Sequence, residues 1–202
     1  MAAFPRTVRP SRVGQFEFQG PLVSGTSGGK IETRGTGHVG GSWVEEFNVV
    51  DLTTAAGMAF LFDIGQLHDS GTNFTVVPET HLTALGTIAT GVAGLVNGAS
   101  QTGATLVTDG WASDGTIVKG SYIIVAGLSY PLFVSATATV VAGAANISVY
   151  PSIASGDAPA DNAAVTLNGA MTCKFRDKPN VPKSITGIHL YTGLALRFNT
   201  DT

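Results

Sequence analysis

Apolar and polar residues alternate along most of this chain, and a period of two predicts β-strands. In the first part the pattern marks strands at 14–18, 30–36, 43–50 and 73–77, with a flexible loop at 24–29 and a tight turn at Gly40 and Gly41. Later strands, rich in Val, Ile, Tyr and Phe, are expected at 104–108, 120–127, 132–141, 146–150, 163–167, 170–176 and 193–199. Pro151 should end the strand at 146–150, because proline has no N–H for the ladder.

One segment has a helical period instead. Thr53 or Thr54 can cap the helix, and Gly71 is a suitable stop. Between them, apolar positions recur at steps of three and four residues. These positions are Gly57, Phe60, Leu61, Ile64, Leu67 and His68. We therefore expect a single helix within an otherwise β-rich chain.

Charged residues divide the chain. Lys and Arg number 11 and Asp and Glu 14, yet only five of these 25 lie within 89–167: Asp109, Asp114, Lys119, Asp157 and Asp161. The reversal of composition at both ends predicts a domain at 89–167 inserted into a second one made of 1–88 with 168–202. The alternative is one domain whose middle sheet is more buried. Five short strands in the insert fit a small barrel, with a five-stranded Greek-key barrel as the leading candidate.

The predicted fold is therefore mainly β. It combines a split β-barrel or sandwich domain carrying one helix with an inserted small Greek-key barrel, similar to oligomer-binding (OB-like) barrels.

Composition narrows the function. With 202 residues, 44% hydrophobic, the chain can bury a core and is not expected to be disordered. It has no apolar run near the roughly 18 residues of a membrane span, and its first residues show no secretory signal pattern. A single cysteine, Cys173, rules out an internal disulfide. A net charge of −3 gives no electrostatic reason to expect nucleic acid or a membrane as partner.

Candidate chemistry is sparse. The four histidines, His38, His68, His81 and His189, lack the spacing of a zinc site. Glu45 and Glu46 would point to opposite faces of a strand and could not serve one substrate as acid and base. The glycine-rich run at 25–30 lacks the spacing of a phosphate-binding loop, and no G-x-S-x-G elbow is present.

The remaining candidates have simpler roles. Cys173 is expected to be a buried thiol, and Asp157, Asp161 and Asn162 to be turn residues, not calcium ligands. Trp43 is expected in the core of the first domain and Trp111 as a turn anchor. We thus expect no catalytic, cofactor-binding or metal-binding residue, no cofactor, and no enzyme activity.

The N-terminal arginines, Arg6, Arg9 and Arg12, alternate with Pro5 and Pro10. Three charges are too few for a nucleic-acid arm. We expect an extended arm that lies on a neighbouring subunit. A Gly- and Thr-rich chain with few charges also suits assembly with copies of itself.

The order of motifs resembles the distal tail proteins of long-tailed bacteriophages, of the type whose second domain is an OB-like barrel. In the first domain the likeness rests on 28–32, 42–49, the helix at 53–68 and the strand at Asn73 and Phe74. In the insert it rests on 108–111, 119–124 and 147–151, and it ends with strands at 171–176 and 194–198. Ser121 departs from the family, in which Asp tends to follow the Lys-Gly turn.

The resemblance implies a virion structural protein, assembled in the host cytoplasm. It would form a homohexameric ring at the junction of tail tube and tail tip, with the tube protein and the tip or hub proteins as partners. Alternatives are another virion structural protein such as a head decoration protein, a carbohydrate-binding β module using Trp111, and an unrecognised hydrolase.

Overall fold

The computed structural model describes residues 2–10, 54–71 and 73–173, and the backbone of the strands at 12–13, 17–19, 22–27, 30–35, 40–47, 174–175 and 194–199. His38, His189 and the Pro-containing loop at 177–183 lie outside these residues, as does the side chain of Trp43. The chain divides into two compact units, here called the sheet unit and the barrel unit. The sheet unit comprises Met1–Gly20, Val39–Glu79 and Thr172–Thr202, and the barrel unit Pro21–His38 and Thr80–Met171.

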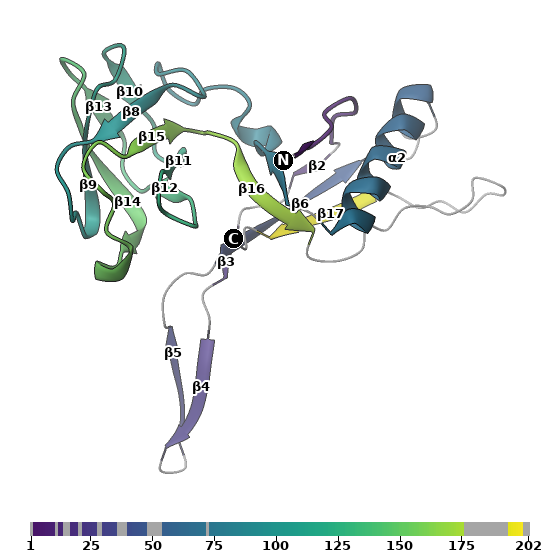
Figure 1. The fold of residues 1–202 in the computed structure, drawn as a ribbon, viewed down its shortest axis with the longest axis horizontal. Coiled ribbons are helices and arrows are strands. Elements are labelled where there is room, and N and C mark those ends of the chain that lie inside the picture. Colours follow the sequence, from purple (N-terminus) through teal and green to yellow (C-terminus); the bar gives the residue numbers. More distant parts are fainter. Residues whose placement is uncertain are drawn as a thin grey trace. The chain divides into compact units, whose positions relative to one another are not determined.

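The sheet unit is built on seven strands (Figure 1). Their order is β1 (Ala2–Ala3), β7 (Phe74–Val76), β16 (Met171–Phe175), β17 (Leu194–Asn199), β6 (Gly40–Phe47) and β2 (Arg12–Val13), and β3 (Glu17–Gln19) also pairs with β6. Strand β1 runs parallel to β7, whereas β6 and β17 are antiparallel over six residue pairs, from Leu194–Phe47 to Asn199–Ser42. Gly40 and Gly41, predicted as a turn, therefore belong to a strand.

The predicted helix is confirmed as α2 (Ala55–Ser70), the one α-helix among the described residues. The Thr54 side chain caps it by accepting a hydrogen bond from the Gly57 N–H. Gly71 ends it at φ 59°, the left-handed conformation that glycine adopts without strain. The inward positions Gly57, Phe60, Leu61 and Ile64 are buried as the pattern predicts.

The barrel unit contains a closed antiparallel barrel of six strands (Figure 1). Around the barrel these are β11 (Tyr122–Val125), β12 (Leu132–Val134), β14 (Ala145–Ile153), β9 (Gly103–Asp109), β8 (Ala93–Val96) and β15 (Ala164–Leu167), which pairs again with β11. Two further strands, β10 (Gly115–Ile117) and β13 (Ala138–Val140), form a separate pair. Short 3-10 turns lie at η1 (Glu79–His81) and η2 (Ser155–Asp157).

Five strands were expected in this segment, and the differences have local causes. The predicted strand 132–141 is interrupted between β12 and β13, while β8 and β10 are too short to give a periodic signal. Strand β14 continues through Pro151 to Ile153, so the expectation that Pro151 ends it is wrong. Its register with β9 shifts between Ser148 and Ile153, and proline is tolerated at such an irregularity because no ladder N–H is required there.

Strands β4 (Leu22–Ser27) and β5 (Lys30–Gly35) form a two-stranded antiparallel hairpin, in register from Leu22–Gly35 to Ser27–Lys30. Residues 24–27, predicted as part of a flexible loop, are therefore strand. Among the described strands, β4 and β5 pair only with each other.

Candidate interaction surfaces

Within the part of the chain that the structure describes, no three His, Cys, Asp or Glu side chains come together in a group that could hold a metal ion. The candidates considered above instead have structural contacts. Cys173 is fully buried. Asp161 accepts hydrogen bonds from the Gly98 N–H and from Asn162, which fixes the loops around β8 and β15.

Asp157 accepts a 3.0 Å hydrogen bond from the Tyr130 hydroxyl. Burial, this hydrogen bond and the charge of Asp157 together raise the pKa of Tyr130 to about 12. Asp157 therefore stabilises the protonated phenol at the edge of the barrel core.

Trp111 is part of the barrel core and only 4% exposed. Its Nε1–H donates a 2.8 Å hydrogen bond to the Thr108 hydroxyl, which in turn donates to the Ala145 carbonyl. Gly94 lies directly against the indole, so that a Cβ at this position would be 2.6 Å from Cε2 of Trp111. The prediction of a turn anchor understated this role, and the buried ring has no face on which a sugar could stack.

The His81 side chain is positioned by polar contacts at both ring nitrogens and by an aromatic contact. Nε2 lies 3.0 Å from the Gly120 carbonyl and Nδ1 lies 2.8 Å from the Thr80 hydroxyl. Because a carbonyl only accepts, Nε2 carries the proton, and in the neutral ring Nδ1 accepts from Thr80. Burial lowers the pKa of His81 below its usual 6.5, although the hydrogen bond to Gly120 acts in the opposite direction. The packing thus favours a neutral imidazole.

Tyr122 joins the two ends of Thr80–Met171, the segment of the barrel unit that contains the barrel. The His81 ring meets its ring edge-on, with centroids 4.9 Å apart, next to the point where the chain enters the unit at Thr80. At the exit, the Tyr122 hydroxyl donates a 2.7 Å hydrogen bond to the Gly169 carbonyl, and its N–H donates to Asn168 Oδ1. Entry and exit of the chain are therefore fixed at one buried side chain. No local pattern in the sequence signals this arrangement, because the hydrogen-bond partners Asn168 and Gly169 are 46 and 47 residues from Tyr122.

The N-terminal segment packs on its own chain. Phe4 is buried, with its ring centroid 6.0 Å from that of Phe60 and 5.8 Å from that of Phe74. Arg6 lies over the Phe4 ring, donates a 2.6 Å hydrogen bond to the Val77 carbonyl and pairs with Glu79 at 3.7 Å. For residues 2–8 the expectation of an arm on a neighbouring subunit is wrong, because Phe4 and Val8 complete the core of the sheet unit.

No protein-family model matches this sequence, and a search of curated proteins finds none that is similar to it. Among the described residues, no helix has both the length and the apolar character to cross a membrane. We therefore consider what the exposed surfaces of the described residues indicate about function.

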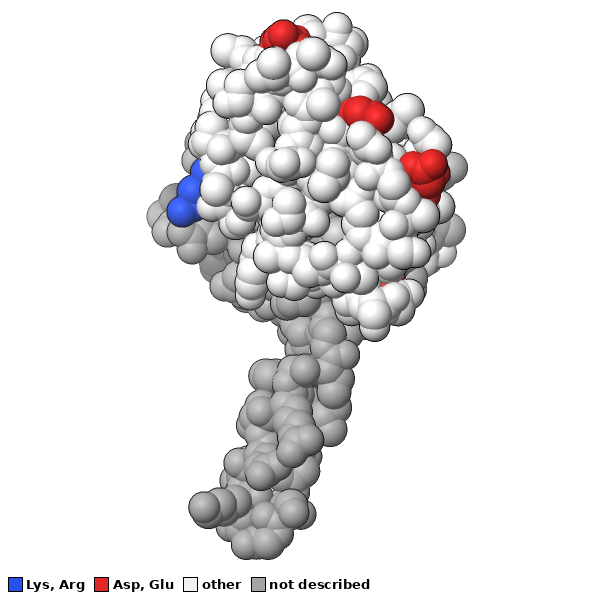
Figure 2. Space-filling model, turned by 90° about the vertical axis from the view of Figure 1, so that its left-hand side faces the viewer, with Lys and Arg blue, Asp and Glu red and all other residues white. Residues whose placement is uncertain are grey.

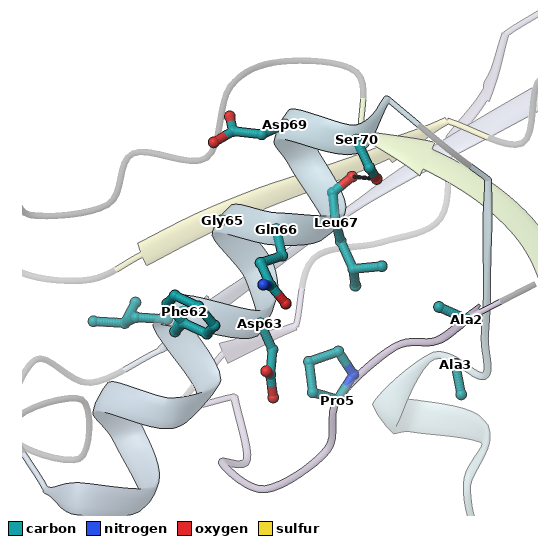
Figure 3. A pocket seen from close by; sticks show the side chains of 11 residues that line it. Ala2, Ala3, Pro5, Phe62, Asp63, Gly65, Gln66, Leu67, Asp69 and Ser70 are labelled. Carbon is teal, nitrogen blue, oxygen red and sulfur yellow. Dashed lines mark hydrogen bonds between the residues drawn. The ribbon is translucent and has the colours of Figure 1, made fainter.

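One distinctive surface is the outward side of α2. Met58 is 49% exposed and Phe62 is 65% exposed, although both are large and apolar. Beside them, the second half of α2 and the N-terminal segment enclose an open groove of about 920 Å³, lined by Ala2, Ala3, Pro5, Leu61, Phe62, Asp63, Gly65, Gln66, Leu67, Asp69 and Ser70 (Figure 3). The sequence pattern identified only the apolar positions of this helix that face the core. Met58 and Phe62, four residues apart, were the available signal for the second side.

A second surface is the outside of the barrel. The face in Figure 2 is almost free of charge, with acidic side chains near its margin. The exposed side chains of the barrel strands include the apolar or aromatic residues Leu95, Val107 and Tyr150, on β8, β9 and β14. A soluble domain usually carries charge on about a quarter to a third of its surface residues. Such a surface is suited to contact with another protein surface.

Proposed function

We propose that this chain is a structural subunit of a bacteriophage tail, a distal tail protein that forms a ring where the tail tube meets the tail tip. The observation that carries the proposal is the connectivity. The sheet unit, with one α-helix among its described residues, is interrupted at Pro21–His38 and again after Glu79, where the segment with the closed antiparallel barrel begins, and it resumes at Thr172. The distal tail family that the sequence resembles has the same order of parts.

The finer description of the barrel is part of the proposal. Strands β11, β12 and β14 are successive antiparallel neighbours, and β15 returns to pair with β11. This order, with a returning fourth strand beside the first, supports the proposed Greek-key arrangement. It supports an OB-like fold for the insert at 89–167. In the proposed assembly this insert is an appendage of the ring.

In the proposed assembly, residues 1–88 with 168–202 form a homohexameric ring and the barrel decorates its outside. A ring requires two different complementary patches on each subunit, and closure follows from the rotation between neighbours. The flanks carry twenty of the 25 charged residues, and such charges can fix the register of neighbouring subunits. The partners would be the tail tube protein and the tip or hub proteins, in a virion assembled in the host cytoplasm.

The test is electron microscopy of the purified chain, with its mass measured in parallel by light scattering. We expect closed six-fold rings, and rings that persist when 89–167 is replaced by a short Gly/Ser linker. A wild-type protein without closed rings would contradict the proposal. A monomeric deletion variant, together with an isolated barrel that self-associates, would reverse the roles of the two domains.

A further inference from the structure

Helix α2 is apolar on two sides. Its inward side covers the core through Phe60, Leu61 and Ile64. Its outward side carries Ala55, Met58, Ala59 and Phe62, all exposed and spaced by three or four residues. We call these four residues the outer ridge. A helix that only covers a sheet is expected to be polar on its outward side, so the outer ridge has the composition of a helix–helix contact.

Exposed side chains of opposite charge lie near the two ends of α2. Arg9 lines a small hollow with Thr54 and Ala56 at the first turn of α2, and its side chain is 88% exposed. Asp69 follows Phe62 by seven residues, and therefore lies on the same side two turns later, with its side chain 78% exposed. Arg9 lies 3.9 Å from Glu79, and Asp69 lies 3.1 Å from His68. The partners Glu79 and His68 are only 18% and 26% exposed, whereas the charged groups of Arg9 and Asp69 remain open to solvent.

This charge pattern is self-complementary when the helix is reversed. If a second α2 runs antiparallel with Phe62 near a two-fold axis, the Arg9 end of each copy meets the Asp69 end of the other. The antiparallel arrangement also makes the interaction of the two helix dipoles favourable, because each positive N-terminus lies beside a negative C-terminus. Ala55 and Ala59 leave room for the helices to approach to the usual 8–10 Å.

We propose that the outer ridge is a homotypic interface, in which the α2 helices of two copies pack antiparallel around Phe62, with Arg9 of each facing Asp69 of the other. The occupant is thus a second copy of this chain. The contact is independent of the proposed ring, because a two-fold axis cannot relate successive subunits of a cyclic hexamer. In a ring-forming protein it would join one ring to another, and without rings it would give a dimer.

The first experiment measures the mass of the full-length chain over a range of concentrations, for the wild type, Phe62→Ser and Val141→Ser. Val141 is a matched control, since it is 63% exposed and lies in the barrel unit. We expect Phe62→Ser to weaken association by at least about tenfold in Kd, as loss of a central aromatic anchor does. Val141→Ser should associate like the wild type. The mass should fall by half at low concentration, whether from dimer to monomer or from paired to single rings.

The second experiment identifies the contact by exchanging charges. Arg9→Glu alone and Asp69→Arg alone should each weaken association, and the double variant should restore it. Restoration cannot arise within one subunit, because the two residues lie near opposite ends of a helix about 24 Å long. Phe62→Cys should also give a covalent dimer with a short bis-maleimide, whereas Val141→Cys should not. The native Cys173 is buried and should not react.

Three outcomes would overturn the inference: a wild-type protein with no concentration-dependent doubling of mass, a Phe62→Ser variant that associates like the wild type, or single charge variants that the double variant fails to rescue. Circular dichroism of each variant checks that the fold is retained, which is expected because the substituted side chains are exposed. If six-fold rings form in every variant and no pairing of rings is seen, the proposed function is supported and only the proposed α2 interface is contradicted.

Discussion

At the residue scale, the stability of the barrel depends on contacts between side chains that are distant in sequence. Trp111 fills the core only because Gly94 leaves space for the indole and because Thr108 accepts its N–H. The sequence showed a Trp after a Gly, which is typical of a turn. The proximity of Gly94 and Ala145 to Trp111 follows only from the register of β8, β9 and β14, which the sequence does not reveal.

Gly94→Ala should destabilise the barrel by roughly 1–3 kcal/mol, because the new methyl group would overlap the Trp111 ring and force the core to shift. Urea unfolding followed by intrinsic fluorescence measures the loss. Gly156→Ala is the control, since a Cβ there meets nothing within 4 Å. In the double variant Gly94→Ala with Trp111→Leu, the loss should be smaller than the sum of the single losses. A strictly additive result would contradict the packing described.

The free energy of unfolding should depend on pH through His81. Burial lowers its pKa in the folded chain, so below about pH 6.5 the unfolded chain binds a proton that the folded chain does not. Stability is therefore fully present above this pH and is lost as the pH falls toward the pKa of the folded state. His81→Gln should have a flatter pH profile between about 7 and 5 than the wild type. His68→Gln, on helix α2 of the sheet unit, is the comparison, and an equal flattening in both variants would count against the assignment to His81.

At the scale of elements, helix α2 was predictable and several strands were not. The helix carries its signals within its own sequence, in Thr54, Gly71 and the spacing of the buried positions. Strand β8 is a run of Ala, Gly, Leu and Val that becomes a strand only between β15 and β9. The N-terminal segment was misassigned for a similar reason, since its strand β1 exists only by pairing with β7.

Thr54→Ala should cost about 1 kcal/mol of the stability of the sheet unit, because the Gly57 N–H loses the cap that satisfies it. Thr54→Ser keeps the hydroxyl and should stay close to the wild type. Chemical denaturation followed by circular dichroism at helical wavelengths compares the two. If the two variants lose the same amount, the hydroxyl does not act as a cap.

At the scale of the molecule, two separate cores explain the two units. The barrel core is one continuous cluster from Ile88 to Leu167, to which no described residue of the sheet unit belongs. The uneven charge density along the sequence predicted an inserted domain at 89–167, which stays a prediction, whereas the barrel unit comprises Pro21–His38 and Thr80–Met171. The distribution of charge could not show that His81 and Asn168 hold the two ends of the barrel segment against Tyr122.

A fragment of residues 80–171 should fold alone and unfold cooperatively, since its core is contained within it. A fragment of 89–167 should be less stable, because it lacks the core residue Ile88 and also His81, Asn168 and Gly169, which contact Tyr122. Dispersed amide spectra and thermal unfolding of both fragments give the comparison. Equal stability of the two fragments would show that the Tyr122 contacts contribute nothing measurable.

The convergence of both chain connections on Tyr122 also has an evolutionary consequence. Domains whose two ends lie close together can be inserted into or removed from a host chain with little disturbance. Here the incoming His81 and the outgoing Gly169 touch the same side chain. Recombination between related genes could therefore exchange the barrel for another module as a single cassette, and we expect relatives of this chain to differ most between these two residues.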